Sequence, residues 1–294
     1  MRPALGIWLL EIGYWNLDFM KLTLLGYPLS HTLSPAMHNA ALADVGLTDW
    51  RYDALSVEPE HLSEAVARIR SDEYAGANVT VPYKEAVIPW LDGLTPVAQA
   101  IGAVNTLLKK DGHLIGHNTD AAGFLADLHA HGVNAARHTV LLLGSGGAAR
   151  AVVAACAGIG AHIRVAALER PQAETLKTVA SVEIFGWTPL EILQASDNVA
   201  LIVNATPLGM SPKIEASPWA DDLPLPPDAF VYDCVYNPAE TRLVRQARTA
   251  GLRAATGLGM LVEQGALAFE LWTGKLAPRK LMRLAAEEKL FGVK

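Results

Sequence analysis

The sequence has few of the residues that build metal centres, disulfide frameworks or membrane spans. Its 294 residues include two cysteines, Cys156 and Cys234, and no CxxC or HExxH motif occurs. We therefore expect no structural or catalytic metal. No uninterrupted apolar run reaches the roughly 18 residues of a transmembrane helix, so we expect no membrane partner. Both cysteines fall in apolar segments, which favours reduced core thiols and a cytoplasmic location.

The chain also lacks an excess of positive charge. Its formal net charge is −6, and no run of lysine or arginine overrides that balance. We therefore expect no nucleic-acid partner. Hydrophobic residues make up 51% of the chain and charged residues 18%, proportions typical of a compact folded protein. With 294 residues the chain exceeds the roughly 250 at which single cores stop growing, which predicts two domains.

The N-terminal extension, residues 1–19, does not fit a signal peptide. Arg2 precedes an apolar run from Pro3 to Leu10, but Glu11 ends that run and no small-residue cleavage site follows. An extra strand, a disordered tail and a start codon placed upstream of Met20 are all compatible with this stretch. Its role stays open.

Strand-like and helix-like segments alternate along the chain. Ser34 before Pro35 predicts a helix with serine as its N-cap. A proline-dense segment, residues 211–228, predicts a surface loop. Apolar runs predict strands at Lys21–Gly26, Trp50–Val57, Gly76–Val81, Ile163–Leu168, Val199–Asn204 and Phe230–Val235, with a hairpin of Val104–Leu108 and His113–Gly116 at a sheet edge. Helical spacing predicts helices at Pro59–Arg70, Asp120–His131, Pro171–Val179, Glu240–Ala250, Leu261–Trp272 and Arg279–Lys289.

This alternation predicts an α/β protein of two domains. The first is an N-terminal α/β domain over residues 20–120, completed by residues 257–294. The second is a Rossmann-type domain over residues 121–256, with a doubly wound parallel sheet that binds a dinucleotide. A cleft between the two would hold the ligands at the carboxyl ends of the strands.

A glycine-rich turn lies at the start of the second domain. Val140–Leu143 is apolar without alternation, as in a strand buried on both faces, and Gly144, Gly146 and Gly147 follow it before a helix-prone segment. Such a turn lets backbone N–H groups and a helix N-terminus hold a pyrophosphate. The pattern is GxGGxxR rather than GxGxxG, so a tight turn without a ligand is the alternative interpretation of this motif alone.

Short polar stretches lie next to the predicted strands. Before the glycine turn they are Thr32 with Ser34, the run NVTVPYK from Asn78 to Lys84, Asn105-Thr106 and Asn118-Thr119-Asp120; after it they are Asn204-Ala-Thr206, Tyr236-Asn-Pro238 and the segment from Gly257 to Gln264. Together with the turn, their order and spacing closely resemble the shikimate dehydrogenase family from about Lys21 to Leu281. The NVTVPYK and GxNTD elements carry the resemblance most specifically.

The resemblance implies reversible hydride transfer between a nicotinamide cofactor and the secondary alcohol of shikimate, giving 3-dehydroshikimate. It implies acid/base roles for Lys84 and Asp120, which match the family's lysine and aspartate beside the reacting hydroxyl. An alcohol releases hydride readily only if its proton also leaves, so a proton acceptor must lie within hydrogen-bond reach. In the reducing direction the Lys84 ammonium can donate the proton to the forming alkoxide.

The resemblance also implies a set of substrate contacts. Thr32 and Ser34 match the paired hydroxyl residues that bind the substrate carboxylate. Many biosynthetic members have serine at both places, and the extra methyl of Thr32 leaves the substrate preference open. The residues matched to the ring hydroxyls and to the lining of the same site are Thr80, Asn105, Gln264 and Tyr236.

The implied cofactor is NADP or NAD. The residues matched to its binding are Gly144, Ser145, Gly146, Gly147, Ala148, Glu169, Arg170, Asn204, Thr206 and Gly257. NADP-dependent members hold the 2′-phosphate with an Asn-Arg-Thr motif, where this chain reads Ala167-Leu168-Glu169-Arg170. Glu169 can accept hydrogen bonds from a ribose 2′-OH and would repel a phosphate, which slightly favours NAD. Arg170 and Arg150 can each hold a phosphate instead.

Three functions follow from these observations. Shikimate dehydrogenase activity is the leading prediction. The alternatives are an NAD-preferring quinate/shikimate dehydrogenase or a relative acting on an amino-substituted ring, and a non-catalytic module that senses cofactor or shikimate. The presence of both Lys84 and Asp120 argues against the last. The expected partners are small molecules, and we expect a monomer or a homodimer.

Overall fold

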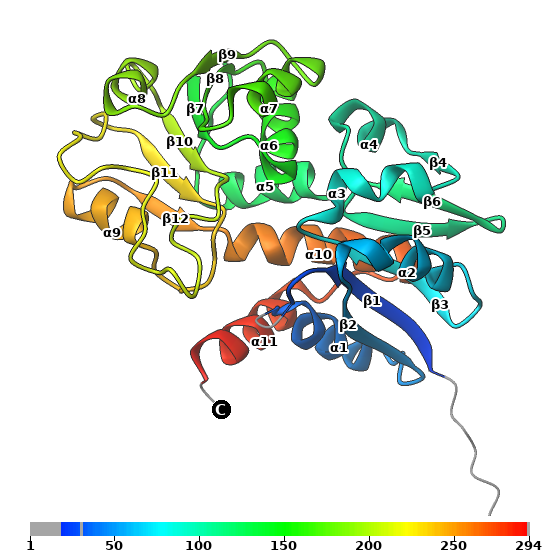
Figure 1. Ribbon diagram of the computed structural model, residues 1–294. Coiled ribbons are helices and arrows are strands. Elements are labelled where there is room, and N and C mark those ends of the chain that lie inside the picture. Colours follow the sequence, from blue (N-terminus) through cyan, green and yellow to red (C-terminus); the bar gives the residue numbers. More distant parts are fainter. Residues whose placement is uncertain (1–18, 30–31, 293–294) are drawn as a thin grey trace, which may run out of the picture.

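A computed structural model of the protein describes residues 19–29 and 32–292. The extension of residues 1–19 therefore lies, except for Phe19, outside the described residues. The chain forms two six-stranded sheets, and helices α5 (Asp120–Ala130) and α10 (Leu258–Thr273) run between them (Figure 1). The predicted α/β fold is confirmed.

The first sheet is mixed and has the order β2-β1-β3-β5-β6-β4. Its strands are β1 (Met20–Gly26), β2 (Trp50–Ser56), β3 (Tyr74–Val79), β4 (Gly93–Leu94), β5 (Thr106–Lys110) and β6 (His113–His117). Strands β1, β2 and β3 are parallel, while the predicted hairpin β5–β6 runs antiparallel. Its predicted place at the edge is wrong, because the two-residue strand β4 pairs with β6 and covers it.

Helices of the first half connect these strands. They are α1 (Ser34–Asp44), α2 (Leu62–Ile69), α3 (Tyr83–Ala86) and α4 (Pro96–Ile101). The sequence predicted α1 and α2 but gave no signal for α4. That helix is six residues long and begins at Pro96 after the Thr95 N-cap, so it is too short for a helical period to show.

The second sheet is parallel throughout and has the order β12-β11-β10-β7-β8-β9. Its strands are β7 (Thr139–Leu143), β8 (His162–Ala166), β9 (Glu183–Phe185), β10 (Leu201–Asn204), β11 (Phe230–Asp233) and β12 (Ala254–Thr256). Its helices are α6 (Gly147–Gly158), α7 (Arg170–Glu174), α8 (Pro189–Ala195) and α9 (Arg242–Thr249). This is the strand order of a doubly wound dinucleotide-binding sheet, and the predicted sheet is confirmed.

One helix of the second half departs from its prediction. A single helix was expected over residues 171–179, but α7 ends at Glu174 and a 3₁₀ segment, Thr175–Thr178, follows. Arg150 hydrogen-bonds the hydroxyls of Thr175 and Thr178. Two threonines that bond back to carbonyls three residues earlier favour such a tighter turn.

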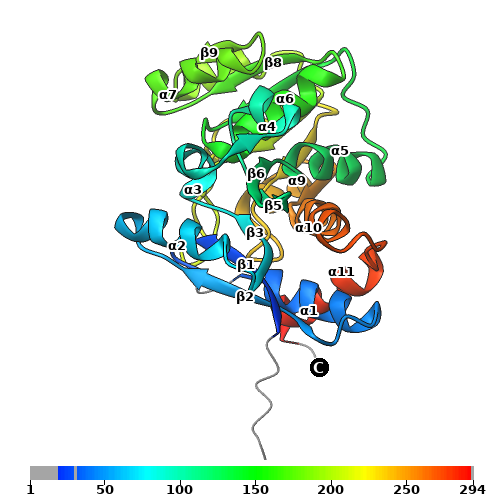
Figure 2. The same cartoon turned by 90° about the vertical axis from the view of Figure 1, so that its right-hand side faces the viewer.

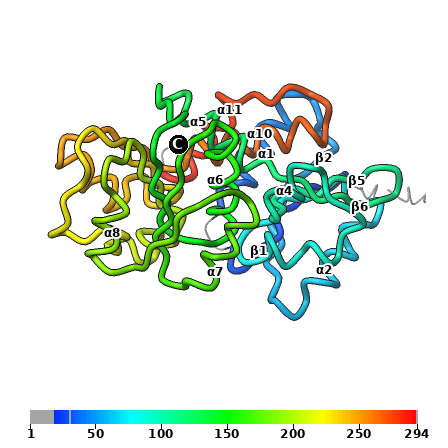
Figure 3. The backbone as a smooth tube through the Cα atoms, turned by 90° about the horizontal axis from the view of Figure 1, so that it is seen from above, coloured from blue at the N-terminus to red at the C-terminus, as the bar shows by residue number. Residues whose placement is uncertain are grey.

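The run Val140–Leu143 is apolar throughout because both faces of β7 are buried. In β7, Val140 and Leu142 pack into one core, and Leu141 and Leu143 pack into another on the opposite face. A strand covered on both faces needs no polar alternation. Helix α10 packs against α5, and α11 (Arg279–Phe291) packs against α1 (Figures 2 and 3). The C-terminal helices thus share one core with β1 and α1.

His38 of α1 is a buried titratable side chain with an expected effect on acid stability. Its ring is fully buried and stacks on Tyr52 with centroids 4.2 Å apart. Within the described residues, neither of its ring nitrogens has a hydrogen-bond partner. Burial lowers the pKa of His38 from 6.5 to about 3, because the charged form loses its hydration there.

Because of His38, the free energy of unfolding should therefore decrease as the pH is lowered. The unfolded state takes up the proton at a pKa of about 6.5 while the folded state stays neutral, so each pH unit below about 6 should remove about 1.4 kcal/mol of unfolding free energy. Denaturant titrations at pH 7, 6, 5 and 4 check this. The advantage of the wild type over His38→Leu should shrink as the pH falls, and a change at the exposed His162 to glutamine should not alter the slope. Parallel pH dependence of wild type and His38→Leu would contradict it.

Candidate active site

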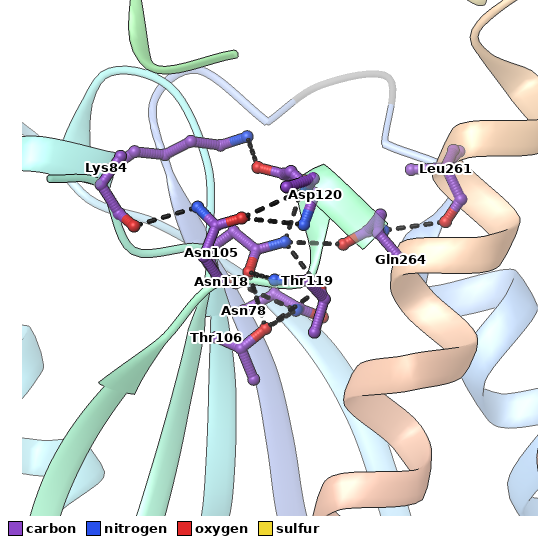
Figure 4. A network of polar contacts seen from close by, with 11 residues as sticks. Asn78, Lys84, Asn105, Thr106, Asn118, Thr119, Asp120, Leu261 and Gln264 are labelled. Atoms are coloured by element: carbon purple, nitrogen blue, oxygen red, sulfur yellow. Dashed lines mark hydrogen bonds and ion pairs between the residues drawn. The ribbon is translucent and has the colours of Figure 1, made fainter. Parts of the chain in front are cut away.

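Lys84 and Asp120 form the centre of the site. The Lys84 Nζ donates to Asp120 Oδ2 at 2.6 Å, and their side chains are 14% and 5% exposed (Figure 4). The structure thus brings together the two residues to which the family resemblance assigns acid/base roles. A nearly buried amine and carboxylate in contact can pass a proton to and from a bound molecule.

Two local features place this pair. Lys84 lies in the single turn of α3, just after β3, and its carbonyl accepts from the N–H of Val104 at 2.7 Å. Asp120 is the first residue of α5, where the positive end of the helix favours a carboxylate. Its own N–H donates to Asn118 Oδ1 at 3.0 Å, and Asn118 donates to the Ala103 carbonyl at 2.9 Å.

Asn105 connects the pair to the rest of the site. Its Nδ2 lies 2.9 Å from Asp120 Oδ1, 2.8 Å from the Thr119 hydroxyl and 3.1 Å from Gln264 Oε1, so its two hydrogens are shared among three acceptors. Its Oδ1 accepts from the Thr119 N–H at 2.8 Å. Gln264 comes from α10, 159 positions away in the sequence. Helix α10 can approach α5 this closely because residue 123 is glycine. A Cβ at Gly123 would lie 2.7 Å from the backbone nitrogen of Gln264.

Thr32 and Ser34 lie before and at the start of α1. Ser34 is buried, and its N–H donates to the Thr32 hydroxyl at 3.3 Å. The predicted capping role of Ser34 is wrong, since Leu33 is the N-cap and no side chain caps the helix. The Ser34 hydroxyl instead lies beside the buried hydroxyl of Tyr52, where the contact opposes the rise that burial causes in the pKa of Tyr52.

Thr80 and Tyr236 are the other two residues matched to the substrate. Thr80 is half-buried at the end of β3, where its methyl lies against Gly26. Tyr236 is half-buried in the loop after β11, packs against the core that contains α1 and α10, and has its pKa raised by burial. Both residues leave part of their surface exposed, whereas Asn105 is 2% exposed.

The glycine turn lies where the order of the parallel strands reverses, between β7 and β10. Gly144 has φ +104°, and a Cβ there would lie 2.8 Å from the Thr206 methyl. Only glycine fits both constraints. No side chain caps α6, and a Cβ on Gly146 would meet nothing within 4 Å. Open space above uncapped helix N–H groups fits a pyrophosphate.

Gly147 joins the turn to the ion pair. A Cβ at this position would lie 3.2 Å from the Cβ and 3.3 Å from the Cδ of Lys84. The stem of Lys84 therefore packs directly on the first turn of α6. A dinucleotide at this turn would lie next to the amine. Ser145, also in the turn, donates to Gln172 Oε1 at 3.1 Å.

Asn204 and Gly257 have internal packing partners. Asn204 is fully buried; it donates to Asp233 Oδ1 at 2.8 Å and accepts from the Thr206 N–H and hydroxyl. Burial raises the pKa of Asp233 to about 6. A Cβ on Gly257 would lie 2.3 Å from the Cys234 carbonyl oxygen. Both residues shape the loops around the turn.

The arginine of the GxGGxxR pattern does not lie where a phosphate would bind. Arg150 is 7% exposed, donates to the Ile101 carbonyl of α4 at 2.8 Å and bonds the two threonines after α7. These contacts argue against the possibility that Arg150 holds a phosphate, because they hold its guanidinium against α4 and the two threonines. Gly102 leaves the space for it, since a Cβ there would lie 2.5 Å from Arg150 Nη2.

Glu169 and Arg170 remain exposed at the start of α7. Glu169 is the N-cap residue but makes no side-chain capping bond. Arg170 contacts Glu174 at 3.6 Å and is 63% exposed. Both side chains therefore remain accessible to a ligand beside β8.

Tyr52 holds the polar network but was missed by sequence reasoning, because nothing in the sequence distinguishes it from the other residues of its predicted strand. Asn78, Thr106 and Asn118 lie inside the polar stretches that the sequence singles out, and these stretches mark their positions without their partners. Among residues 19–29 and 32–292, no group of three metal-ligating side chains occurs and no helix is long and apolar enough to cross a membrane.

Comparisons with known proteins agree on one family. The family models for the shikimate dehydrogenase substrate binding domain and the shikimate 5'-dehydrogenase C-terminal domain match residues 24–107 and 257–287. A curated relative, shikimate dehydrogenase (NADP(+)) of Symbiobacterium thermophilum, is 45% identical over 280 residues, which cover 92% of this chain and 95% of the relative.

Solved structures show the same similarity. The shikimate 5-dehydrogenase of Thermus thermophilus, in complex with NADP(H) and shikimate, is 40% identical with a TM-score of 0.84, covering 92% of this chain and 100% of that one. The enzyme of Listeria monocytogenes, in complex with shikimate and NAD, is 33% identical with a TM-score of 0.81, covering 90% and 96%. At these identities over nearly its whole length, the chain belongs to the shikimate dehydrogenase family.

Proposed function

We propose that this protein is a shikimate dehydrogenase that interconverts shikimate and 3-dehydroshikimate. The observation that carries the proposal is the contact of 2.6 Å between Lys84 and Asp120. On one side this pair packs on the glycine turn, and on the other it is bonded to the buried Asn105. The relative from Symbiobacterium supports the substrate, since it is named for this activity.

Lys84 and Asp120 are proposed to donate and accept the proton of the reacting hydroxyl. During reduction, the Lys84 ammonium donates a proton to the oxygen of the carbonyl as it becomes an alcohol. Asp120 orients the ammonium and balances its charge. During oxidation, the same pair accepts the hydroxyl proton. Gly144, Gly146 and Gly147 would hold the dinucleotide, which would supply the hydride in reduction and accept it in oxidation.

The remaining polar residues are proposed to bind the substrate. Thr32 and Ser34 would offer two hydroxyl donors to the carboxylate, while Thr80, Asn105 and Gln264 would bond the ring hydroxyls. Polar partners of this kind reject a ligand that lacks the matching hydroxyl, because they would be left unpaired. The segments 20–120 and 257–294 would thus form the substrate half of the enzyme, and the segment 121–256 the cofactor half.

We propose that the cofactor is NADP, although Glu169 slightly favours NAD on sequence grounds. The relative from Symbiobacterium is named as NADP(+)-dependent, and the Listeria structure holds NAD. Arg170 is available to pair with a 2′-phosphate, since its contact with Glu174 is loose at 3.6 Å. Glu169 should then reduce the preference for NADP over NAD without abolishing it. The two free thiols support a cytoplasmic location.

Initial rates with shikimate and with quinate, each against NAD and NADP, test the proposal. We expect turnover of shikimate, with a higher kcat/KM for NADP than for NAD. A preference for NAD with quinate accepted would instead indicate a catabolic quinate/shikimate enzyme. Binding of shikimate or cofactor by calorimetry without any turnover would indicate the sensing module.

A further inference from the structure

Buried hydrogen bonds run from strand β2 to the ion pair of the site. The hydroxyl of Tyr52, a residue 1% exposed, donates to Asn78 Oδ1 at 2.8 Å. Asn78 Nδ2 donates to the Asn105 carbonyl at 3.1 Å and reaches the Thr106 hydroxyl at 3.4 Å. The Thr106 hydroxyl donates to Asn105 Oδ1 at 2.9 Å. Asn105 Nδ2 then donates to Asp120 Oδ1 at 2.9 Å (Figure 4).

The direction of this chain is fixed by backbone groups. The Thr119 N–H can only donate, so the Asn105 atom that it contacts is the oxygen and the amide nitrogen faces Asp120. The Asn105 carbonyl can only accept, so the Asn78 atom that faces it is the nitrogen and the oxygen faces Tyr52. Every bond therefore donates from β2 towards the carboxylate.

Tyr52 is itself held firmly. The side chain of Asn39 accepts from the Tyr52 N–H at 2.9 Å and donates to its carbonyl at 2.8 Å. The ring stacks on His38 with an interplanar angle of 5°. These contacts hold the Tyr52 ring in place, with its hydroxyl directed at Asn78.

We propose that Tyr52 is a positioning residue that acts through Asn78, Thr106 and Asn105 on Asp120. The proposal rests on the function proposed above and adds a residue that lies behind the substrate site. Hydrogen bonds in a chain polarise one another, so the Tyr52 hydroxyl strengthens Asn105 as a donor to the carboxylate. It thereby keeps Asp120 turned towards Lys84.

Tyr52→Phe tests this directly because it removes only the hydroxyl. We expect kcat for shikimate oxidation to fall about tenfold, while the KM for the dinucleotide stays within about twofold. Tyr74→Phe is the matched control. Tyr74 is also buried in the first half, at the start of β3, and its ring lies near the side chains of Lys21 and Arg68, away from the hydrogen-bonded chain. Its kcat should match the wild type.

Thr106 provides a second and independent variant. Thr106→Val breaks the same chain and should lower kcat about tenfold, whereas Thr106→Ser keeps the hydroxyl and should restore most of the activity. If both residues act through one chain, the Tyr52→Phe, Thr106→Val double variant should lose about as much as either single one. Thermal unfolding of every variant is recorded alongside.

The outcomes separate the two proposals. A lower Tm with unchanged kcat in Tyr52→Phe would show a purely structural hydroxyl and overturn the positioning role. Losses that multiply to about a hundredfold in the double variant would also overturn it, because the two residues would then act independently. If the wild type itself fails to oxidise shikimate, the proposed function falls instead.

Discussion

Replacing Lys84 by methionine is expected to lower kcat for shikimate by about 10²-fold to 10⁴-fold, the range over which a positioned proton donor or acceptor acts. Methionine keeps an unbranched stem to pack on Gly147, where an added Cβ would lie 3.2 Å from the Cβ and 3.3 Å from the Cδ of Lys84. The loss would therefore come from the amine and not from a collapsed cleft. Steady-state rates in both directions measure the effect.

Two comparisons make this result specific. Lys109→Met removes a lysine of β5 that contacts the Ser71 carbonyl and Asp72 away from the site, and should leave kcat unchanged. Calorimetry should give a Kd for shikimate that changes less than kcat, because the carboxylate contacts proposed for Thr32 and Ser34 remain. A Lys84→Met enzyme with wild-type kcat would refute the proton-transfer role.

Gly259→Ala is expected to cost about 2–4 kcal/mol of unfolding free energy and to lower the Tm by roughly 5–10 °C. A Cβ at Gly259, in the first turn of α10, would lie 1.8 Å from Asp127 Oδ1. Asp127 is 2% exposed and accepts from the Tyr232 hydroxyl at 2.7 Å. The carboxylate cannot retreat without breaking that bond, so the two helices α5 and α10 would have to separate.

Gly158→Ala is the matched control for this substitution. Gly158 lies in the last turn of α6, and a Cβ there would meet nothing within 4 Å. Alanine favours a helix over glycine by about 1 kcal/mol, so this variant should be neutral or slightly more stable. Differential scanning calorimetry of both variants and the wild type measures the Tm values. Equal Tm values for Gly259→Ala and the wild type would show that α10 can shift at no cost.

The parts of the fold that could be predicted depend on local signals. The run Val140–Leu143 indicates a strand buried on both faces, and Gly144 after it indicates a tight turn, because each signal is carried by a few adjacent residues. In the structure Gly144 has φ +104°. The helices α10 and α11 show a helical period over several turns. The six-residue helix α4 and the three-residue strands β9 and β12 are too short for any period to appear.

The candidate site was likewise predictable only in part. The motifs place Lys84 and Asp120 at strand and helix ends, and the resemblance suggests their roles, but the 36 positions between them leave their distance open. The predicted strand Trp50–Val57 contains Tyr52, but nothing in its sequence marks Tyr52 as part of the site or names Asn78 as its partner. The arginine of the glycine pattern suggested a phosphate site, whereas the approach of Ile101 turns it inwards.

The sequence by itself determined the α/β alternation, the glycine turn and the polar motifs, since backbone preference and hydrophobic period depend on neighbours along the chain. Only the tertiary structure decided which polar groups meet. Asn105 contacts Gln264 across 159 positions because α10 returns against α5 at Gly123. That return depends on the packing of whole helices and sheets, and short segments of sequence carry no record of it.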